Sequence, residues 1–291
     1  YQAGRPYACE SFGFETVFSG AAQGKHAQGW AAAGPLGLGV RHFWQQHPKE
    51  LAVTSKGLDA WLHTDRLGEF FWSEVPGIAK THELLLTVGV AEPAPLFETF
   101  AAGPLLAASP DWYLESGVFP FLAPPDARSK AYEQVLEQRF DACQWTSYGW
   151  KDFGDKSSYQ KAAPALTHSF NNHHYEEPRT QFHQFLRSGD IKWFHQGVIG
   201  ARHFMDIDVQ HSPGPNRYAE FSGTQPNHGP GFVWMHYSHD HQGLGHVSHF
   251  HLSGLRQYYL LTGDGRAREV LKEVADYTAA LIEDPPATLY G

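Results

Sequence analysis

The sequence contains two cysteines, Cys9 and Cys143, and two methionines in 291 residues. Two cysteines cannot build a disulfide scaffold or a thiolate zinc cage, although one disulfide between them stays open. No apolar run reaches the roughly 18 residues that a membrane-spanning helix needs. Lysine and arginine number 22 against 31 aspartates and glutamates, so the net charge is −9. Because nucleic-acid binding needs a basic face, this balance argues against that class of protein.

Aromatic residues and histidines are abundant instead. Hydrophobic residues make up 42% of the chain and aromatic residues 14%, which indicates a folded globular protein. Fourteen of the 19 histidines lie between Trp145 and His251. Histidine changes its charge near neutral pH, so this region can become positive and accept an anionic ligand.

The first part of the chain has the pattern of an all-β domain. Short apolar or alternating runs, separated by glycine and proline, predict strands at residues 12–18, 36–44, 50–53, 58–62 and 83–90. Alternation of this kind is typical of antiparallel sheets with one buried face. We therefore expect an antiparallel β-sandwich or barrel.

The pattern changes in the middle of the chain. Residues 93–125 are rich in proline and alanine and predict a connector. A helix is predicted from Asp126, because Tyr132, Val135, Leu136 and Phe140 follow at spacings of three and four. We place the domain boundary near residue 105, with the end of a β-domain in 1–105 and a helical domain in 106–291.

The helical part contains a weak repeat. Gly189-Asp190 and Gly263-Asp264 each follow one helical pattern and precede another. Glycine ends helices and aspartate caps the next one, so both sites predict helical hairpins. Successive hairpins form an α/α toroid, of which this chain would hold a part, and the alternative is an ordinary helical bundle. We expect the sequence to be a fragment of a longer protein, since it begins without Met and holds only part of such a ring.

Long polar loops of such a toroid gather at one mouth and carry candidate site residues. In the first loop, Trp145, Tyr148 and Trp150 offer flat faces to sugar rings, and Lys151 suits a carboxylate. The alternative is a packed aromatic cluster that fixes the loop.

A second loop contains five consecutive polar groups at the entrance of a predicted helix. Asn171 and Asn172 can donate to a carboxylate, and His173 or His174 can accept a proton beside Tyr175. The alternative is a helix cap followed by surface histidines.

A third loop carries His236, Tyr237, His239 and His241, and the same His-x-x-His-x-His spacing recurs ten residues later. Neutral imidazole is a common zinc ligand, so a metal site is one interpretation and packed histidines are the other. The helix after Asp190 adds Trp193 and Arg202. Arg202 could clamp a carboxylate or pair with Asp206 four residues on.

Several of these motifs together resemble a known family. The segments 148–155, 171–176, 236–246 and 258–264, which follow a β-domain and a proline-rich connector, are similar to exo-rhamnogalacturonan lyases with a central β-sandwich and a C-terminal α/α toroid. The resemblance implies a carbohydrate-active enzyme, exported to the periplasm or the extracellular space, that acts on a uronate-containing polysaccharide. It would cover the end of the sandwich and the first hairpins of the toroid.

The expected reaction is β-elimination without a metal or other cofactor. Asn172 and Arg202 would neutralise the uronate carboxylate, His173 or His174 would act as base and Tyr237 as acid, with help from His236 or His239. Substrate contacts are expected from Trp145, Tyr148, Trp150, Lys151, Asn171, Tyr175, Trp193 and His241.

Three other functions stay open at this point. A glycoside hydrolase would need two carboxylates, with candidates Glu176, Glu177, Asp206, Asp208 and Asp240. A sugar-binding module would need the aromatic residues alone. Zinc at the histidine repeats would give a metalloprotein. The sequence predicts no nucleic-acid partner, and it predicts no membrane-spanning segment.

Overall fold

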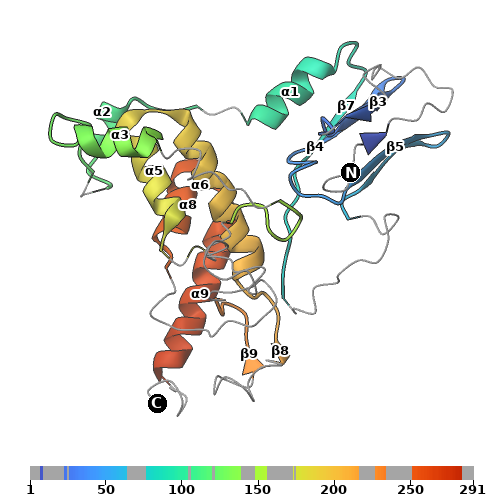
Figure 1. Cartoon of the computed structure of the whole chain (residues 1–291). Coiled ribbons are helices and arrows are strands. Elements are labelled where there is room, and N and C mark those ends of the chain that lie inside the picture. The colour runs from blue at the N-terminus through green and yellow to red at the C-terminus, as the bar shows by residue number, and fades with distance from the viewer. Residues whose placement is uncertain are drawn as a thin grey trace, which may run out of the picture. The chain divides into compact units, whose positions relative to one another are not determined.

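The computed structural model describes residues 7–8, 23–24, 26–63, 77–103, 106–119, 122–138, 148–155, 173, 175–215, 227–233 and 251–283. The chain divides into two compact units (Figure 1). The first holds Tyr1–Trp72, Lys80–Leu106 and Tyr148–Phe153, and the second holds Ser73–Ala79, Ala107–Ser147 and Gly154–Gly291. Among the described residues, no helix combines the length and the apolar character that a bilayer crossing requires.

Antiparallel strands dominate the first unit. Strands β3 (Trp30–Ala33), β4 (Leu36–Val40) and β7 (Leu84–Val88) form a sheet in the order β3-β4-β7. Strands β5 (Glu50–Thr54) and β6 (Gly57–Trp61) form a hairpin that contacts β3 and β4. A further short pair joins β1 (Tyr7–Ala8) to β2 (Gln23–Gly24).

Four of the five strands expected from the sequence are confirmed. β4 stops at Val40 rather than continuing to residue 44, because residues 41–46 form turns. The fifth, at 12–18, lies outside the described residues. The described part of the first unit is thus antiparallel β, arranged as the three-stranded sheet, the β5-β6 hairpin and the short β1-β2 pair, together with a helix.

That helix lies within the segment 93–125, for which the sequence predicted a connector and no helix. Helix α1 (Ala94–Ala102) has proline in its first turn, where a missing N–H costs nothing, and ends at Gly103 with a left-handed φ of 70°. Its Phe97 is 2% exposed and stacks on Trp30 with ring centroids 5.1 Å apart. A Cβ on Gly39 of β4 would come within 2.5 Å of the Phe97 ring, so this glycine lets the ring lie directly on the strand.

The second unit is helical. It contains α2 (Pro110–Glu115), α3 (Lys130–Gln138), α5 (Glu177–Ser188), α6 (Ile191–His203), α8 (Ser253–Thr262) and α9 (Gly265–Glu283). α5 packs on α2, α6 and α8, and α8 packs on α9 (Figure 1). A short strand pair, β8 (Gly214–Pro215) with β9 (Asn227–His228), follows α6.

Both predicted helical hairpins are confirmed. Gly189 ends α5 with a φ of 75°, and the Asp190 side chain accepts a hydrogen bond from the Lys192 backbone at 3.1 Å. Gly263 ends α8 with a φ of 69°, and Asp264 accepts from the Arg266 backbone at 2.9 Å. Helix stop and helix cap therefore occupy adjacent positions in each turn.

Aromatic side chains form the core of the helical unit. Phe182 of α5 is fully buried, with its ring 5.9 Å from Phe194 of α6 and 6.3 Å from Tyr258 of α8. A Cβ on Gly197 would lie 2.6 Å from the Phe182 ring, so glycine at this position allows α6 to approach α5. The hairpins thus share one core rather than standing independently.

We expect Phe97→Ala to lower the free energy of unfolding by about 3–5 kcal/mol, since it leaves a cavity over β4. Urea unfolding followed by circular dichroism measures the change. Leu96→Ala on the same helix is the control, because Leu96 is 47% exposed and should cost much less. Equal losses from the two variants would contradict the packing described for α1.

Candidate functional site

The C-terminal end of α6 widens into a π-helical turn, η1 (Phe204–Asp208). The Val209 N–H donates to the Phe204 carbonyl, five residues back, at 3.2 Å. In an α-helix, residues five apart point about 140° away from each other. The wider turn instead brings His203 and Asp208 to one face, with Nε2 and Oδ1 3.3 Å apart. Such π turns occur frequently at functional sites.

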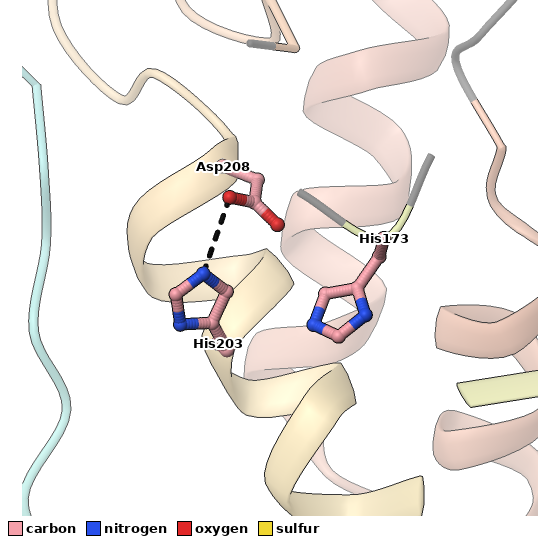
Figure 2. A group of neighbouring side chains, drawn as sticks. All are labelled: His173, His203 and Asp208. Atoms are coloured by element: carbon pink, nitrogen blue, oxygen red, sulfur yellow. Dashed lines mark ion pairs between the residues drawn. The ribbon is translucent and has the colours of Figure 1, made fainter. Parts of the chain in front are cut away.

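A buried cluster of imidazoles and carboxylates lies at this turn, and Figure 2 shows its members His173, His203 and Asp208. Its members are His173, His203, Asp208 and Asp155, all 3% exposed or less. His203 Nε2 lies 3.9 Å from Asp155 Oδ2, and the rings of His173 and His203 are 5.5 Å apart. One ligand-type atom from each of His173, His203 and Asp208 lies within 4.8 Å of the other two. Three segments distant in sequence therefore converge here.

Burial controls the charge state of the cluster. It lowers the pKa of His173 to about 4, and His203 acts in the same direction, while Asp155 and Asp208 oppose the shift. His173 is consequently neutral near pH 7. Neutral imidazole is the form that can coordinate a metal or accept a proton.

His173 begins a strained turn that ends at Glu176. Both residues have left-handed backbones, with φ of 49° and 60°, and the Glu176 N–H donates to the His173 carbonyl at 3.0 Å. Such conformations in residues other than glycine cost of order 1–3 kcal/mol each and concentrate at functional sites. The turn is held from outside, because the Glu176 carboxylate accepts hydrogen bonds from the backbone of Ser253 and Gly254, at 2.7 and 3.0 Å, at the start of α8.

A polar pocket of about 440 Å³ opens beside this turn in the helical unit. Tyr175, which is 70% exposed, and Tyr132 of α3, which is 50% exposed, present aromatic rings among its lining residues. Arg179, His183 and Arg187 line it from α5 at spacings of four, which places them on one face of that helix. The pocket thus combines a row of basic groups with two accessible tyrosine rings.

The histidine of this row is held in a defined orientation. The Gln257 side-chain nitrogen of α8 lies 2.6 Å from His183 Nε2 and donates to it, so the neutral ring carries its own proton on Nδ1. Burial, followed by the nearby Arg179, lowers the pKa of His183. The ring is therefore neutral at neutral pH, and its one basic nitrogen is Nε2, which faces the Gln257 amide.

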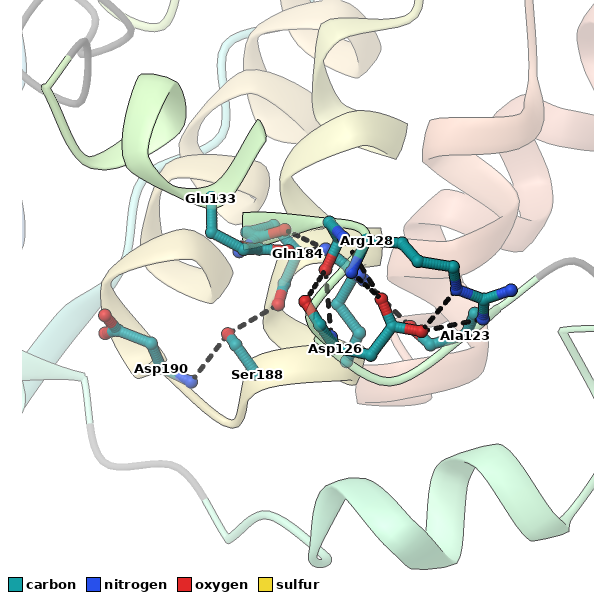
Figure 3. Close-up of polar contacts among 9 residues, drawn as sticks. Ala123, Asp126, Arg128, Glu133, Gln184, Ser188 and Asp190 are labelled. Carbon is teal, nitrogen blue, oxygen red and sulfur yellow. Dashed lines mark hydrogen bonds and ion pairs between the residues drawn. The ribbon is translucent and has the colours of Figure 1, made fainter. Parts of the chain in front are cut away.

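The pocket wall between α3 and α5 is built from charged hydrogen bonds (Figure 3). Arg187 forms an ion pair with Glu133 and donates to the Ala123 carbonyl at 2.9 Å. Gln184 donates to the same Glu133 carboxylate at 2.6 Å. These contacts fix Arg187 in the wall, whereas Arg179 is exposed at the surface of α5.

A hollow of about 680 Å³ adjoins this wall along α3. It is lined by the carboxylates of Asp126, Glu133 and Glu137 together with Lys130. Its excess of acidic groups makes it less suited to an anionic ligand than the pocket on α5.

Two site residues predicted on α6, Arg202 and Trp193, have partners or burial within the helical unit. Arg202 Nε donates to the Tyr258 hydroxyl at 3.2 Å, and that hydroxyl donates to Asp264 at 2.7 Å. Burial is the main reason that the pKa of Tyr258 rises to about 12. Trp193 is 2% exposed, so its burial favours a core role over the expected contact with substrate.

The first predicted loop belongs to the first unit. Tyr148 lies 5.0 Å from Trp44 and 6.1 Å from Phe153, and Trp150 meets His63 edge-on at 5.3 Å, all as ring-centroid distances. The backbone of this loop is tied down as well, since Trp150 N–H donates to the carbonyl at position 47 at 2.8 Å. These contacts favour the alternative of a packed aromatic cluster for the two rings. Lys151 is half-buried in the same loop.

The remaining expected site residues lie outside the described part of the chain, so their roles stay predictions. They are Trp145, Asn171, Asn172, His174, His236, Tyr237, His239 and His241. Of the two histidine repeats, the described residues include only His251, the last histidine of the second repeat.

Sequence reasoning did not predict the basic row or the partners Asp155 and His203. The spacing of four between Arg179, His183 and Arg187 was a usable signal, because it repeats with the period of a helix. No comparable signal marks the pairing of His203 with Asp208, since it depends on a π turn.

A second buried ionisable group occurs in the first unit. Lys49 is fully buried, with its Nζ donating to Gln46 Oε1 at 2.8 Å. Burial, with a smaller effect of Lys80, lowers its pKa to about 7. Burial also lowers the pKa of His82 to about 3, with Lys49 and Lys80 acting in the same direction. The interior of this unit therefore disfavours positive charge.

No family model matches the chain. It is 25% identical, over 324 aligned positions, to a Bacillus subtilis (strain 168) protein described as "Uncharacterized protein YetA". The alignment covers 94% of this chain and 36% of that protein. The chain thus spans about a third of the length of this relative.

We expect Lys49→Met to stabilise the protein most at low pH. The folded-state pKa lies below that of the unfolded chain, so between about pH 7 and pH 10 the unfolded state binds the extra proton and stability rises with pH. The difference in the free energy of unfolding between Lys49→Met and the wild type should therefore shrink by roughly 2–3 kcal/mol between pH 6 and pH 9. Urea unfolding at both pH values measures it.

Lys56→Met is the matched control, because Lys56 is exposed in the turn between β5 and β6. Its difference from the wild type should change little with pH. A constant difference for Lys49→Met across this range would show that Lys49 is solvated in the folded protein.

Proposed function

We propose that the protein is a carbohydrate-active enzyme that cleaves a uronate-containing, rhamnogalacturonan-like polysaccharide by β-elimination. The observation that carries the proposal is the pocket on α5, where Arg179, His183 and two exposed tyrosines line the same space. Aromatic rings suit the C–H faces of sugars, and guanidinium groups suit carboxylates. The volume of about 440 Å³ is within the range of ligand pockets.

β-elimination needs three functions, and the pocket contains a group for each. The Arg179 guanidinium would pair with the uronate carboxylate, which makes the C5 proton easier to remove. His183 would accept this proton at Nε2 once the substrate displaces the Gln257 amide from that nitrogen, and its lowered pKa keeps the ring neutral beforehand. The electron pair then forms the C4–C5 double bond as the C4–O4 bond breaks, and Tyr175 or Tyr132 would donate a proton to the departing oxygen.

The charges of the pocket favour elimination over hydrolysis. A glycoside hydrolase uses two carboxylates on either side of the scissile bond. Among the described residues that line the pocket, Glu176 has the single carboxylate, and both of its oxygens accept backbone hydrogen bonds from α8. The described lining thus offers no free carboxylate pair, whereas it does offer the base and the cation of a lyase.

The finer architecture belongs to the same proposal. The two confirmed hairpins would be the start of an α/α toroid, and the antiparallel strands the end of a β-sandwich, as in the family that the sequence resembles. The predicted loop residues Asn171, Asn172, His174, His236, Tyr237, His239 and His241 would complete the mouth. Export to the periplasm or the extracellular space, where such polysaccharides occur, follows from this substrate.

The direct test is to incubate the chain with a panel of pectic and other uronic polysaccharides. We expect a product with an unsaturated, ultraviolet-absorbing sugar at its new non-reducing end. New reducing ends without that absorbance would identify a hydrolase. Binding without cleavage of any member of the panel would identify a sugar-binding module and contradict the proposal.

Variants of the pocket connect the activity to α5. His183→Ala should lower kcat by about 10²–10⁴-fold, as expected for loss of a general base, and Arg179→Ala should raise KM as well as lower kcat. Arg268→Ala is the control, since Arg268 is an exposed arginine on α9 outside the pocket lining. Unchanged turnover in both pocket variants would exclude this pocket as the active site.

A further inference from the structure

We propose that His173, His203, Asp208 and Asp155 form a binding site for a divalent transition metal ion, with Zn²⁺ as the best match. From the sequence, no cofactor was expected, and the alternative of a metal concerned the histidine repeats at 236–251. The cluster is made of other residues, two of which lie at the end of α6. This inference goes beyond the proposed function and does not depend on it.

The donor set has the chemistry of a zinc site. Two imidazoles and two carboxylates, without thiolate, are ligands that Zn²⁺ takes in proteins. Zn²⁺ with bonds of about 2.0–2.1 Å in a tetrahedron separates its ligand atoms by about 3.3–3.4 Å. His203 Nε2 and Asp208 Oδ1 are 3.3 Å apart, and Asp155 Oδ2 is 3.9 Å from the same nitrogen. One ligand atom from each of His173, His203 and Asp208 lies within 4.8 Å of the other two, so these three residues form the core of the site. Asp155, through its approach to His203 Nε2, is the candidate for the fourth ligand.

The charge of the cluster also suits a cation. Asp155 and Asp208 are both fully buried, and taking carboxylates out of water is costly unless positive charge accompanies them. Glu177 adds a third carboxylate 4.0 Å from His173 Nδ1. A doubly charged ion held by His203 and both aspartates would offset this negative charge inside the protein.

Backbone geometry at the cluster supports the same conclusion. The π turn η1 is what brings His203 and Asp208 to one face, and His173 adopts a left-handed backbone. Gly154, with a φ of 112°, packs so closely that an added Cβ would lie 2.6 Å from the His203 Cβ. Each of these backbone conformations costs free energy, and metal coordination is strong enough to offset that cost.

The burial of all four ligands indicates a closed structural site rather than a catalytic one. Structural zinc sites have four protein ligands, whereas catalytic sites keep one position open to water. The ion would join residues 154–155, the turn that begins at His173, and the end of α6. It would thereby fix the turn that carries Tyr175 at the pocket on α5.

The test measures metal bound to the whole chain. The protein is stripped with chelator, dialysed against a small excess of ZnCl₂, and its zinc determined by mass spectrometry. We expect about one Zn²⁺ per chain that resists dialysis, and a loss of at least tenfold in bound zinc for His203→Gln and Asp208→Asn. His195→Gln, on α6 but outside the cluster, is the control and should retain the ion.

Two further measurements on the unaltered chain keep the proposal testable if a variant fails to fold. Zn²⁺ should raise the melting temperature of the stripped protein, and Co²⁺ should give the intense visible bands of a tetrahedral site. Absence of retained zinc and of any thermal shift would overturn the proposal. So would retention of zinc by folded His203→Gln and Asp208→Asn, which would place the ion at the histidine repeats instead.

Discussion

The burial of imidazole against carboxylate at the end of α6 is the interaction on which the arrangement of the helical unit depends. His203 and Asp208 can meet only because the helix widens into a π turn, and Asp155 reaches the same nitrogen from a segment some fifty residues earlier. Charged groups of this kind are costly in the interior unless they are matched. The cluster therefore joins three segments, while the two hairpins share the aromatic core of α5, α6 and α8.

A short turn connects this interior to the surface. His173 lies in the cluster, while Tyr175, two residues later, is 70% exposed and lines the pocket on α5. Glu176 closes the turn by accepting hydrogen bonds from the first residues of α8. The buried His173 and the exposed Tyr175 thus lie in the same turn. The buried cluster can therefore fix the position of Tyr175 at the pocket on α5 without itself contacting a ligand in that pocket.

Local signals in the sequence were sufficient for much of the fold. The glycine-aspartate turns at 189–190 and 263–264 predicted both hairpins, because a left-handed stop and a side-chain cap act within a few residues. Alternating patterns gave four strands for the same reason. The helix α1 was missed, since its proline and alanine content resembles that of a connector and its stability comes from Phe97 packing on distant glycines. Within the site, His173 and Tyr175 were predicted from the sequence. The pairing of His203 with Asp208 was not, because residues five apart share a face only in a π turn, and no sequence signal marked that turn.

The most direct test of the account is a crystal structure of the chain with a galacturonate-containing oligosaccharide. The account predicts a uronate carboxylate within hydrogen-bonding distance of the Arg179 guanidinium, a sugar ring against Tyr175 or Tyr132, and His183 facing the C5 position. An oligosaccharide bound elsewhere on the protein, with the pocket on α5 empty, would contradict it.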